Sequence, residues 1–313
     1  MENRHELLVR VAQLYYEEDL NQSAIADILH TSRPTVSRLL EEAKSCGIVE
    51  ITVHDPIRKD FRLSQELRKK LKLRDAVVVS GTYDYNQALH RCCEAAIQSF
   101  YGIMDNNMSI GISWGLVPQI FCELMECREY YNVNVVQMVG CMGTGNPNVD
   151  GLELAIRMSK KLHGTYSNIY SPVYVKRREV WEYLMLEPSI QNSIKKAMST
   201  NIIITGVGSM DSSSSIQRAG YWTDEDRIQL EQKGAVGHLL ARPYDKDGNP
   251  VEDTGWYAIG APLEAMKAAD WSIGISAKAF KAHAVLGAVR GGYINTLVVD
   301  QELAEALLKL ADE

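Results

Sequence analysis

The chain has 313 residues, a length typical of about two domains. With 46% apolar and 23% charged residues it has the composition of a soluble globular protein. No apolar run approaches the ~20 residues of a membrane helix, and the polar start MENRHELL lacks the apolar centre of a secretory signal. The net charge of −7 argues against binding of polyanions by the surface as a whole.

The first elements predict a helix-turn-helix domain over residues 1–55. Helical periodicity runs through HELLVRVAQLYYEED, and two short helices follow in QSAIADILH and SRPTVSRLLEEAKSCG. Ser32 suits the N-cap of the third helix, Pro34 suits its first turn, and Gly47 suits its end. His30 falls at the turn, where we expect a left-handed backbone. The following run IVEITV (residues 48–53) predicts a strand and hence a winged variant.

The third helix is the candidate DNA reader. Recognition helices enter the major groove with their N-terminal residues, where Arg pairs with guanine and Thr or Ser contacts bases or phosphates. We therefore predict DNA contacts from Ser32, Arg33, Pro34, Thr35, Ser37 and Arg38. The alternative is a generic three-helix bundle with a solvated arginine face. Residues 1–55 hold five basic and ten acidic side chains, a net charge of −5, so we expect one module alone to bind weakly and to need pairing.

A basic segment follows at residues 56–75, PIRKDFRLSQELRKKLKLRD. It carries eight basic and three acidic side chains, a net charge of +5. Phe61, Leu63, Leu67 and Leu71 fall close to one helical face, which predicts a linker helix with one packed side. A second interpretation is that its bases add non-specific attraction to DNA phosphates.

Residues 76–313 show short apolar strands that alternate with helices, the pattern of a largely parallel α/β sheet. We predict six strands, at residues 76–80, 108–113, 134–140, 200–208, 272–277 and 295–300. Ligands of such sheets bind at the carboxyl ends of the strands. Three of these ends carry small polar or glycine-rich loops, GISWG, GCMGTGNPNVDG and TGVGSMDSSSS, whose backbone N–H groups suit an anion such as phosphate.

The motif GISWG also matches the nucleophile elbow G-x-S-x-G of α/β-hydrolases. No later histidine has telling neighbours, so we interpret Ser113 as a ligand contact rather than a nucleophile. Two isolated charges are further candidates. Asp245 suits a sugar hydroxyl or, alternatively, a turn, and Lys281 suits a phosphate or, alternatively, a solvated helix face.

The six cysteines are Cys46, Cys92, Cys93, Cys122, Cys127 and Cys141. They form no CxxC pair and no Cys/His spacing of a metal site, so neither a metal nor a cofactor is expected. We expect them to be buried free thiols of a cytoplasmic protein.

Taken together, five segments resemble the SorC family of bacterial sugar-responsive transcription regulators over essentially the whole chain. They are IADILHTSRPTVSRLLEEAKSCGIVEI, IGISWG, VVQMVGCMG, GYWTDEDRIQLEQKGAVGHLLARPYDKDG and KAHAVLGAVRGGYINTLVVDQELAEALL. The resemblance implies a helix-turn-helix joined to an effector domain of the sugar-phosphate isomerase-like (NagB/RpiA/CoA-transferase-like) fold. It also implies a phosphorylated sugar or polyol as effector, and homodimers or homotetramers on double-stranded operator DNA.

By position, the resemblance implies an effector pocket made of Ser113, Trp114, Gly115, Gly140, Cys141, Met142, Gly143, Asp245 and Lys281. Cys141 departs from the family, which favours glycine there. The leading hypothesis is a ligand-controlled regulator that is not an enzyme. One alternative is a sugar-phosphate isomerase with an attached DNA reader, although a paired-carboxylate motif is lacking. The other is a constitutive DNA-binding protein whose large domain only oligomerises.

Overall fold

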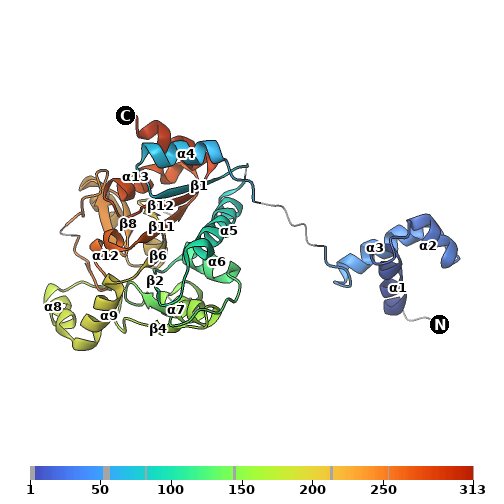
Figure 1. Cartoon of the computed structure of the whole chain (residues 1–313), viewed down its shortest axis with the longest axis horizontal. Coiled ribbons are helices and arrows are strands. Elements are labelled where there is room, and N and C mark those ends of the chain that lie inside the picture. Colours follow the sequence, from blue (N-terminus) through green and yellow to red (C-terminus); the bar gives the residue numbers. More distant parts are fainter. Residues whose placement is uncertain are drawn as a thin grey trace. The chain divides into compact units, whose positions relative to one another are not determined.

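The computed structural model of the chain describes residues 4–51, 57–81, 83–143, 146–211, 214–252 and 254–312 (Figure 1). The chain divides into two compact units, Met1–Pro56 and Ile57–Glu313. Within the described ranges no helix is both long and apolar enough to cross a bilayer.

The small unit contains the predicted helix-turn-helix. Its helices are α1 (Arg4–Tyr16), α2 (Gln22–Ile28) and α3 (Arg33–Ser45). They enclose a core made of Leu8, Val11, Ala12, Ile25, Ala26, Val36, Leu39, Leu40 and Ala43. His30 adopts the expected left-handed backbone, with φ = 49°. Ser32 is the N-cap residue of α3, but its hydroxyl pairs with Thr35 Oγ1 (2.9 Å) and not with a backbone N–H.

The predicted wing is not supported. Residues 48–51 form no strand, and Thr52 and Val53 of the predicted run lie outside the described residues. Ile48 N and Val49 N instead bond to Ala43 O (2.9 and 3.2 Å), which folds this segment back onto the end of α3. The described part of this unit is helical, so a strand here would have no neighbour with which to pair.

The large unit is built on a parallel seven-stranded sheet. Its strands, in spatial order, are β1 (Asp75–Val79), β12 (Thr296–Asp300), β11 (Trp271–Ser276), β6 (Ile202–Gly206), β2 (Ser109–Ile112), β3 (Asn134–Gln137) and β4 (Thr165–Ser167). Every neighbouring pair is parallel. All six predicted strands are present. The strand β4 was missed because it is a three-residue edge strand, TYS, with little burial to mark it.

Helices cover both faces of this sheet (Figure 1). On one face lie α5 (Tyr85–Ile103), α6 (Leu116–Leu124) and α7 (Gly151–Lys161). On the other lie α4 (Phe61–Lys70), α9 (Pro188–Met198), α11 (Asp224–Gln232), α12 (Glu264–Ala268), α13 (Ala282–Arg290) and α14 (Gln301–Leu310). In β6, the side chains of Ile202 and Ile204 belong to the core beneath α5, α6 and α7, and the side chain of Ile203 belongs to the core on the other face. This is the alternation of side chains expected along a strand.

Shorter elements complete the unit. They are α8 (Arg178–Leu186), α10 (Ser215–Arg218), the 3₁₀ turns η1 (Pro147–Val149) and η2 (Ala279–Lys281), a three-stranded antiparallel sheet of β7 (Gly208–Ser209), β8 (Ala235–Leu239) and β9 (Arg242–Asp245), and the pair β5 (Tyr174–Val175) and β10 (Tyr257–Ala258).

The basic segment forms α4, which belongs to the large unit. Leu63 and Leu67 are buried, and the helix packs on β1 and α14. Asp60 caps its start by accepting from Leu63 N (2.8 Å). The bases Arg68 and Lys69 are exposed, so they are accessible for the predicted attraction to phosphates.

All six cysteines are free thiols, but the expectation that they are buried holds only in part. Cys92, Cys93 and Cys122 are buried, and burial raises the pKa of Cys122 to about 12. Cys46 and Cys127 are exposed because they follow the ends of α3 and α6.

Candidate functional site

The large sheet has a topological switch point between β2 and β6. These strands are parallel neighbours, with Ile110 paired to Ile202. The chain leaving β2 enters α6 on one face of the sheet. The chain leaving β6 packs through Val207, Ile216 and Trp222 on the opposite face. Connections that diverge in this way open a crevice at the carboxyl ends of the two strands, where ligands of open α/β sheets bind.

A cleft lies at this point. It consists of two cavities of about 70 and 360 Å³ that share Trp114, Gly115, Leu116, Ser215 and Arg218. The smaller reaches inward to the ends of β2 and β6, to β8 and to Lys281. The larger opens past Met142 and Val149.

The cleft brings together five of the nine predicted effector residues. Ser113, Trp114 and Gly115 lie at its centre, Lys281 lies at its inner end, and Met142 lies in the outer cavity. Gly115 has φ = 111° and is the N-cap residue of α6, so only glycine is free of strain at this entry to the helix. Two N–H groups in the first turn of α6, those of Leu116 and Val117, have no partner within the helix and belong to residues that line the cleft. The N–H of Gly115 donates to Val149 O (2.9 Å), and Pro118 has no N–H.

Ser113 is not arranged as a nucleophile. Its side chain is 4% exposed, and its hydroxyl pairs with Thr205 Oγ1 at 2.9 Å. Thr205 Oγ1 lies in turn 3.0 Å from Gly206 O, so the described contacts of Ser113 include no histidine base. Ser113 and Thr205 together form a polar floor for the cleft, and the sequence did not single out Thr205.

The loop Gly140–Gly143 does not form the open anion cradle that its glycines suggested. The N–H groups of Gly140 and Cys141 donate to Ile259 O (2.9 Å) and Ser171 O (2.7 Å). Those of Met142 and Gly143 donate to Asp150 Oδ2 (2.8 and 3.4 Å), a carboxylate that also caps α7. The carboxylate of Asp150 therefore already occupies the place that a bound anion would take. Of the residues in this loop, Met142 lines the cleft.

Lys281 is the buried cation of the cleft. It is 6% exposed, and its Nζ donates to Ser209 Oγ at 2.7 Å. Burial lowers the pKa of Lys281, with Asp211 opposing that effect and Arg218 adding to it. An ammonium group with little hydration gains more from an incoming anion than a surface lysine does.

Arg218 supplies a second cation, which the sequence did not reveal because it lies in the four-residue helix α10 after the serine-rich loop. Neither Asp nor Glu occurs among the residues that line the two cavities. His238 also lines the cleft, but burial lowers its pKa to about 3, so it is neutral at pH 7. The cleft therefore carries positive charge. Among the described residues, no cluster of three or more His, Cys, Asp or Glu is placed to hold a metal ion.

Asp245 lies outside the cleft, contrary to its predicted role in effector binding. Its carboxylate accepts from Asn249 N (2.8 Å), Asp247 N (3.0 Å) and Asn249 Nδ2 (3.1 Å). Burial alone would raise its pKa, but these hydrogen bonds hold the pKa of Asp245 below its ordinary value. Asp245 therefore acts as a turn residue, the alternative that the surrounding YDKDGN allowed.

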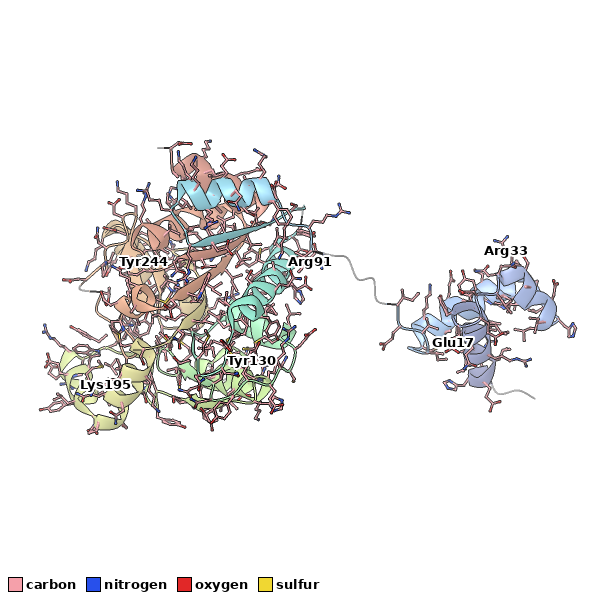
Figure 2. The ribbon with its side chains drawn as sticks, in the orientation of Figure 1. Glu17, Arg33, Arg91, Tyr130, Lys195 and Tyr244 are labelled. Carbon is pink, nitrogen blue, oxygen red and sulfur yellow. The ribbon has the colours of Figure 1, made fainter. Side chains whose placement is uncertain are left out.

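The candidate DNA-reading residues lie at the start of α3. Ser32, Arg33, Pro34 and Arg38 are exposed, while Thr35 and Ser37 are half-buried. Figure 2 shows Arg33 at the surface of the small unit. The acidic Glu41 and Glu42 come two turns later, and Glu42 pairs with Arg4 of α1. The leading end of α3 is therefore basic, although its unit is acidic.

Comparison with known proteins gives consistent matches. The sequence model of a family described as "Putative sugar-binding domain" matches residues 55–309. The chain is 29% identical to the deoxyribonucleoside regulator of Bacillus subtilis over 310 residues, covering 97% of this chain and 98% of that one. It is 28% identical to the sorbitol operon regulator of Klebsiella pneumoniae over 324 residues, covering 99% and 100%. The crystal structure of the full-length sorbitol operon regulator SorC from Klebsiella pneumoniae superposes with a TM-score of 0.73 at 27% identity, covering 96% and 98%.

Proposed function

Because the chain belongs to the SorC family of transcriptional regulators, we propose that a phosphorylated sugar or polyol binds in the cleft and controls its affinity for operator DNA. The observation that carries this proposal is the charge of the cleft. Lys281 and Arg218 line it, and no carboxylate does. A neutral sugar has no need of two cations, whereas a phosphate group gains charge-assisted hydrogen bonds from them.

The start of α6 supports the same assignment. Its unpaired N–H groups carry the positive end of the helix dipole and favour an anion beside Gly115. Ser113 and Thr205 supply hydroxyl groups to the inner cavity, where they can contact oxygen atoms of the sugar beside its phosphate group. The names of the relatives, regulators of deoxyribonucleoside and sorbitol functions, agree with a sugar or polyol as the ligand class.

A thermal-shift screen tests this function. We expect one of a panel of phosphorylated pentoses, hexoses and polyols to raise the Tm, because a ligand at a hundred times its Kd stabilises the folded state by about 2.7 kcal/mol. The same compound should change the affinity of the full chain for operator DNA. If every member of the panel leaves both the Tm and DNA binding unchanged, the proposed class of effector is wrong.

Catalysis is not part of the proposal. Isomerisation of a sugar phosphate requires a positioned base, and the described lining of the cleft contains no carboxylate, while His238 has its Nε2 paired to Ser214 Oγ at 3.1 Å. Turnover of ribose 5-phosphate or glucosamine 6-phosphate by the purified chain would revive the isomerase alternative.

We further propose that the cytoplasmic chain acts as a homodimer or homotetramer held together by the large unit. A single acidic reader should bind DNA weakly, whereas two linked readers gain effective concentration. The small unit has its own core and can be studied as a fragment of residues 1–56. We expect the full chain to bind an operator at least about a hundredfold more tightly than this fragment. Equal affinities, or sedimentation of the full chain as a monomer, would refute the pairing.

A further inference from the structure

The hairpin between β8 and β9 has an unusual tip. Its two turn residues, Leu240 and Ala241, both have positive φ, 46° and 62°. This is the type I′ geometry, which normally selects Asn-Gly because residues with larger side chains are strained in the left-handed region. Both residues are buried, at 3% and 2% exposure, and both line the inner cavity of the cleft. Strained backbone that persists at a ligand cavity points to a role there.

Two side chains hold this tip in place. Tyr174 Oη donates to Ala241 O, and Arg242 Nη1 donates to Leu240 O at 2.8 Å. The remaining donors of Arg242 reach Ala261 O (2.8 Å), Gly260 O (3.2 Å) and Ala258 O (3.3 Å). No carboxylate among the described residues lies within ion-pair distance of Arg242. Its guanidinium group therefore forms hydrogen bonds with carbonyl oxygens instead of an ion pair. We call Arg242 and Tyr174 the hairpin clamp.

The clamp leaves the tip with unused donors. Both tip carbonyls are engaged by the clamp, while the N–H groups of Leu240 and Ala241 donate to no other described residue. In a two-residue hairpin the paired ladder ends at the flanking residues, here Leu239 and Arg242. A buried N–H without an acceptor is rare and costly, and it is best explained when a ligand supplies the acceptor.

We propose that the tip of the β8–β9 hairpin is an effector-recognition element, in which the main-chain N–H groups of Leu240 and Ala241 donate to oxygen atoms of the bound sugar. The hairpin clamp acts as a pair of positioning residues that fix these two donors. The inference rests on the proposed function for the location of the ligand, but it does not depend on the phosphate. Main-chain donors fixed by a strained turn would recognise hydroxyl or phosphoryl oxygen by position, and no side-chain motif in the sequence would report them.

Selective isotope labelling tests the donors directly. With 13C-carbonyl leucine and 15N-alanine, the sequence gives four Leu–Ala amide signals, from Ala155, Ala241, Ala304 and Ala311. The signal of Ala241 is assigned by its loss in Ala241→Gly. The other three amides lie in α7 and α14 or at the end of α14 and serve as internal controls. The probes are ribose 5-phosphate, glucose 6-phosphate and sorbitol 6-phosphate, together with ribose, glucose and sorbitol.

We expect the probe that binds to shift the Ala241 signal and to slow its hydrogen exchange about tenfold, with the other three signals unchanged. Tyr174→Phe should weaken that binding about threefold to tenfold, because it frees the carbonyl of Ala241 and loosens the tip. Tyr244→Phe is the matched control. It removes a buried hydroxyl of the hairpin itself, one that donates to Ala284 O at 2.9 Å and not to the tip, and should leave the affinity unchanged.

A phosphorylated probe that raises the Tm while leaving the Ala241 amide unaltered would overturn the hairpin proposal and leave the proposed function intact. Protection of Ala241 by an unphosphorylated sugar alone would support the hairpin and contradict the phosphate. If no probe alters the Ala241 signal, or if Tyr174→Phe and Tyr244→Phe weaken binding equally, the hairpin tip has only a structural role.

Discussion

Replacement of Lys281 with methionine is expected to weaken binding of the phosphorylated effector by about tenfold to a hundredfold. A hydrogen bond to a charged group contributes about 1.5–3 kcal/mol, and each 1.4 kcal/mol changes affinity tenfold. Lys281 is 6% exposed and lies at the inner end of the cleft, so water cannot replace its contact easily. Calorimetric titration of the effector found in the screen measures the loss.

The stability of the variant separates this effect from damage to the fold. Burial opposes the charged form of Lys281 and lowers its pKa, so a methionine of similar length should leave the Tm without ligand unchanged or higher. Lys267→Met is the matched control, because Lys267 is an exposed lysine of α12 outside the cleft. If Lys281→Met binds the effector as tightly as the unaltered chain does, the phosphate does not bind at the inner end of the cleft.

Six of the seven strands of the large sheet were predictable because they are largely buried on both faces. Runs such as NIIITG and NTLVVD carry no competing helical period, and glycine or polar residues bound them. The shortest antiparallel strands were not predictable, because they are too short to show a pattern in the sequence. The strands β5, β7 and β10 have two residues each, and tertiary contacts rather than local pattern define them.

The candidate cleft was predictable where it follows strand ends and not where it depends on distant partners. Ser113, Trp114 and Gly115 come directly after β2, so chain order alone places them at the carboxyl edge. The loop Gly140–Gly143 also follows a strand, but the acid that fills its N–H groups, Asp150, could not be assigned to it from sequence. The role of Asp245 was also ambiguous in the sequence. An Asp in YDKDGN fits a sugar contact and a turn equally well until the groups that donate to its carboxylate are known.

Arg218 and the tip of the β8–β9 hairpin were harder to predict. Arg218 reaches the cleft from a short helix after a serine-rich loop, and Leu240 and Ala241 line it from a hairpin tip built of apolar residues. Leucine and alanine are not residue types that signal ligand binding, and nothing in the sequence around Arg218 places it at a strand end. Their role follows only from which surfaces the fold brings to the switch point between β2 and β6.

Replacement of Arg38 with alanine is expected to lower the affinity of the full chain for its operator by about fivefold to a hundredfold. Arg38 is exposed in the first half of α3, the part of a recognition helix that reaches base edges, and a bidentate arginine–guanine contact contributes about 1–3 kcal/mol. The measurement is fluorescence anisotropy with a duplex selected from random sequence by the full chain, at several salt concentrations. Arg33→Ala should act in the same direction.

The salt dependence separates base recognition from attraction to phosphates. Loss of a phosphate contact weakens binding to all sequences and reduces the slope of log K against log salt by about one per bound subunit, whereas loss of a base contact relaxes specificity at one position. Lys44→Ala removes the same charge from the last turn of the same helix and should have a small effect. If Lys44→Ala is as damaging as Arg38→Ala, α3 does not enter the groove with its N-terminal end, and its basic leading edge is not the reader.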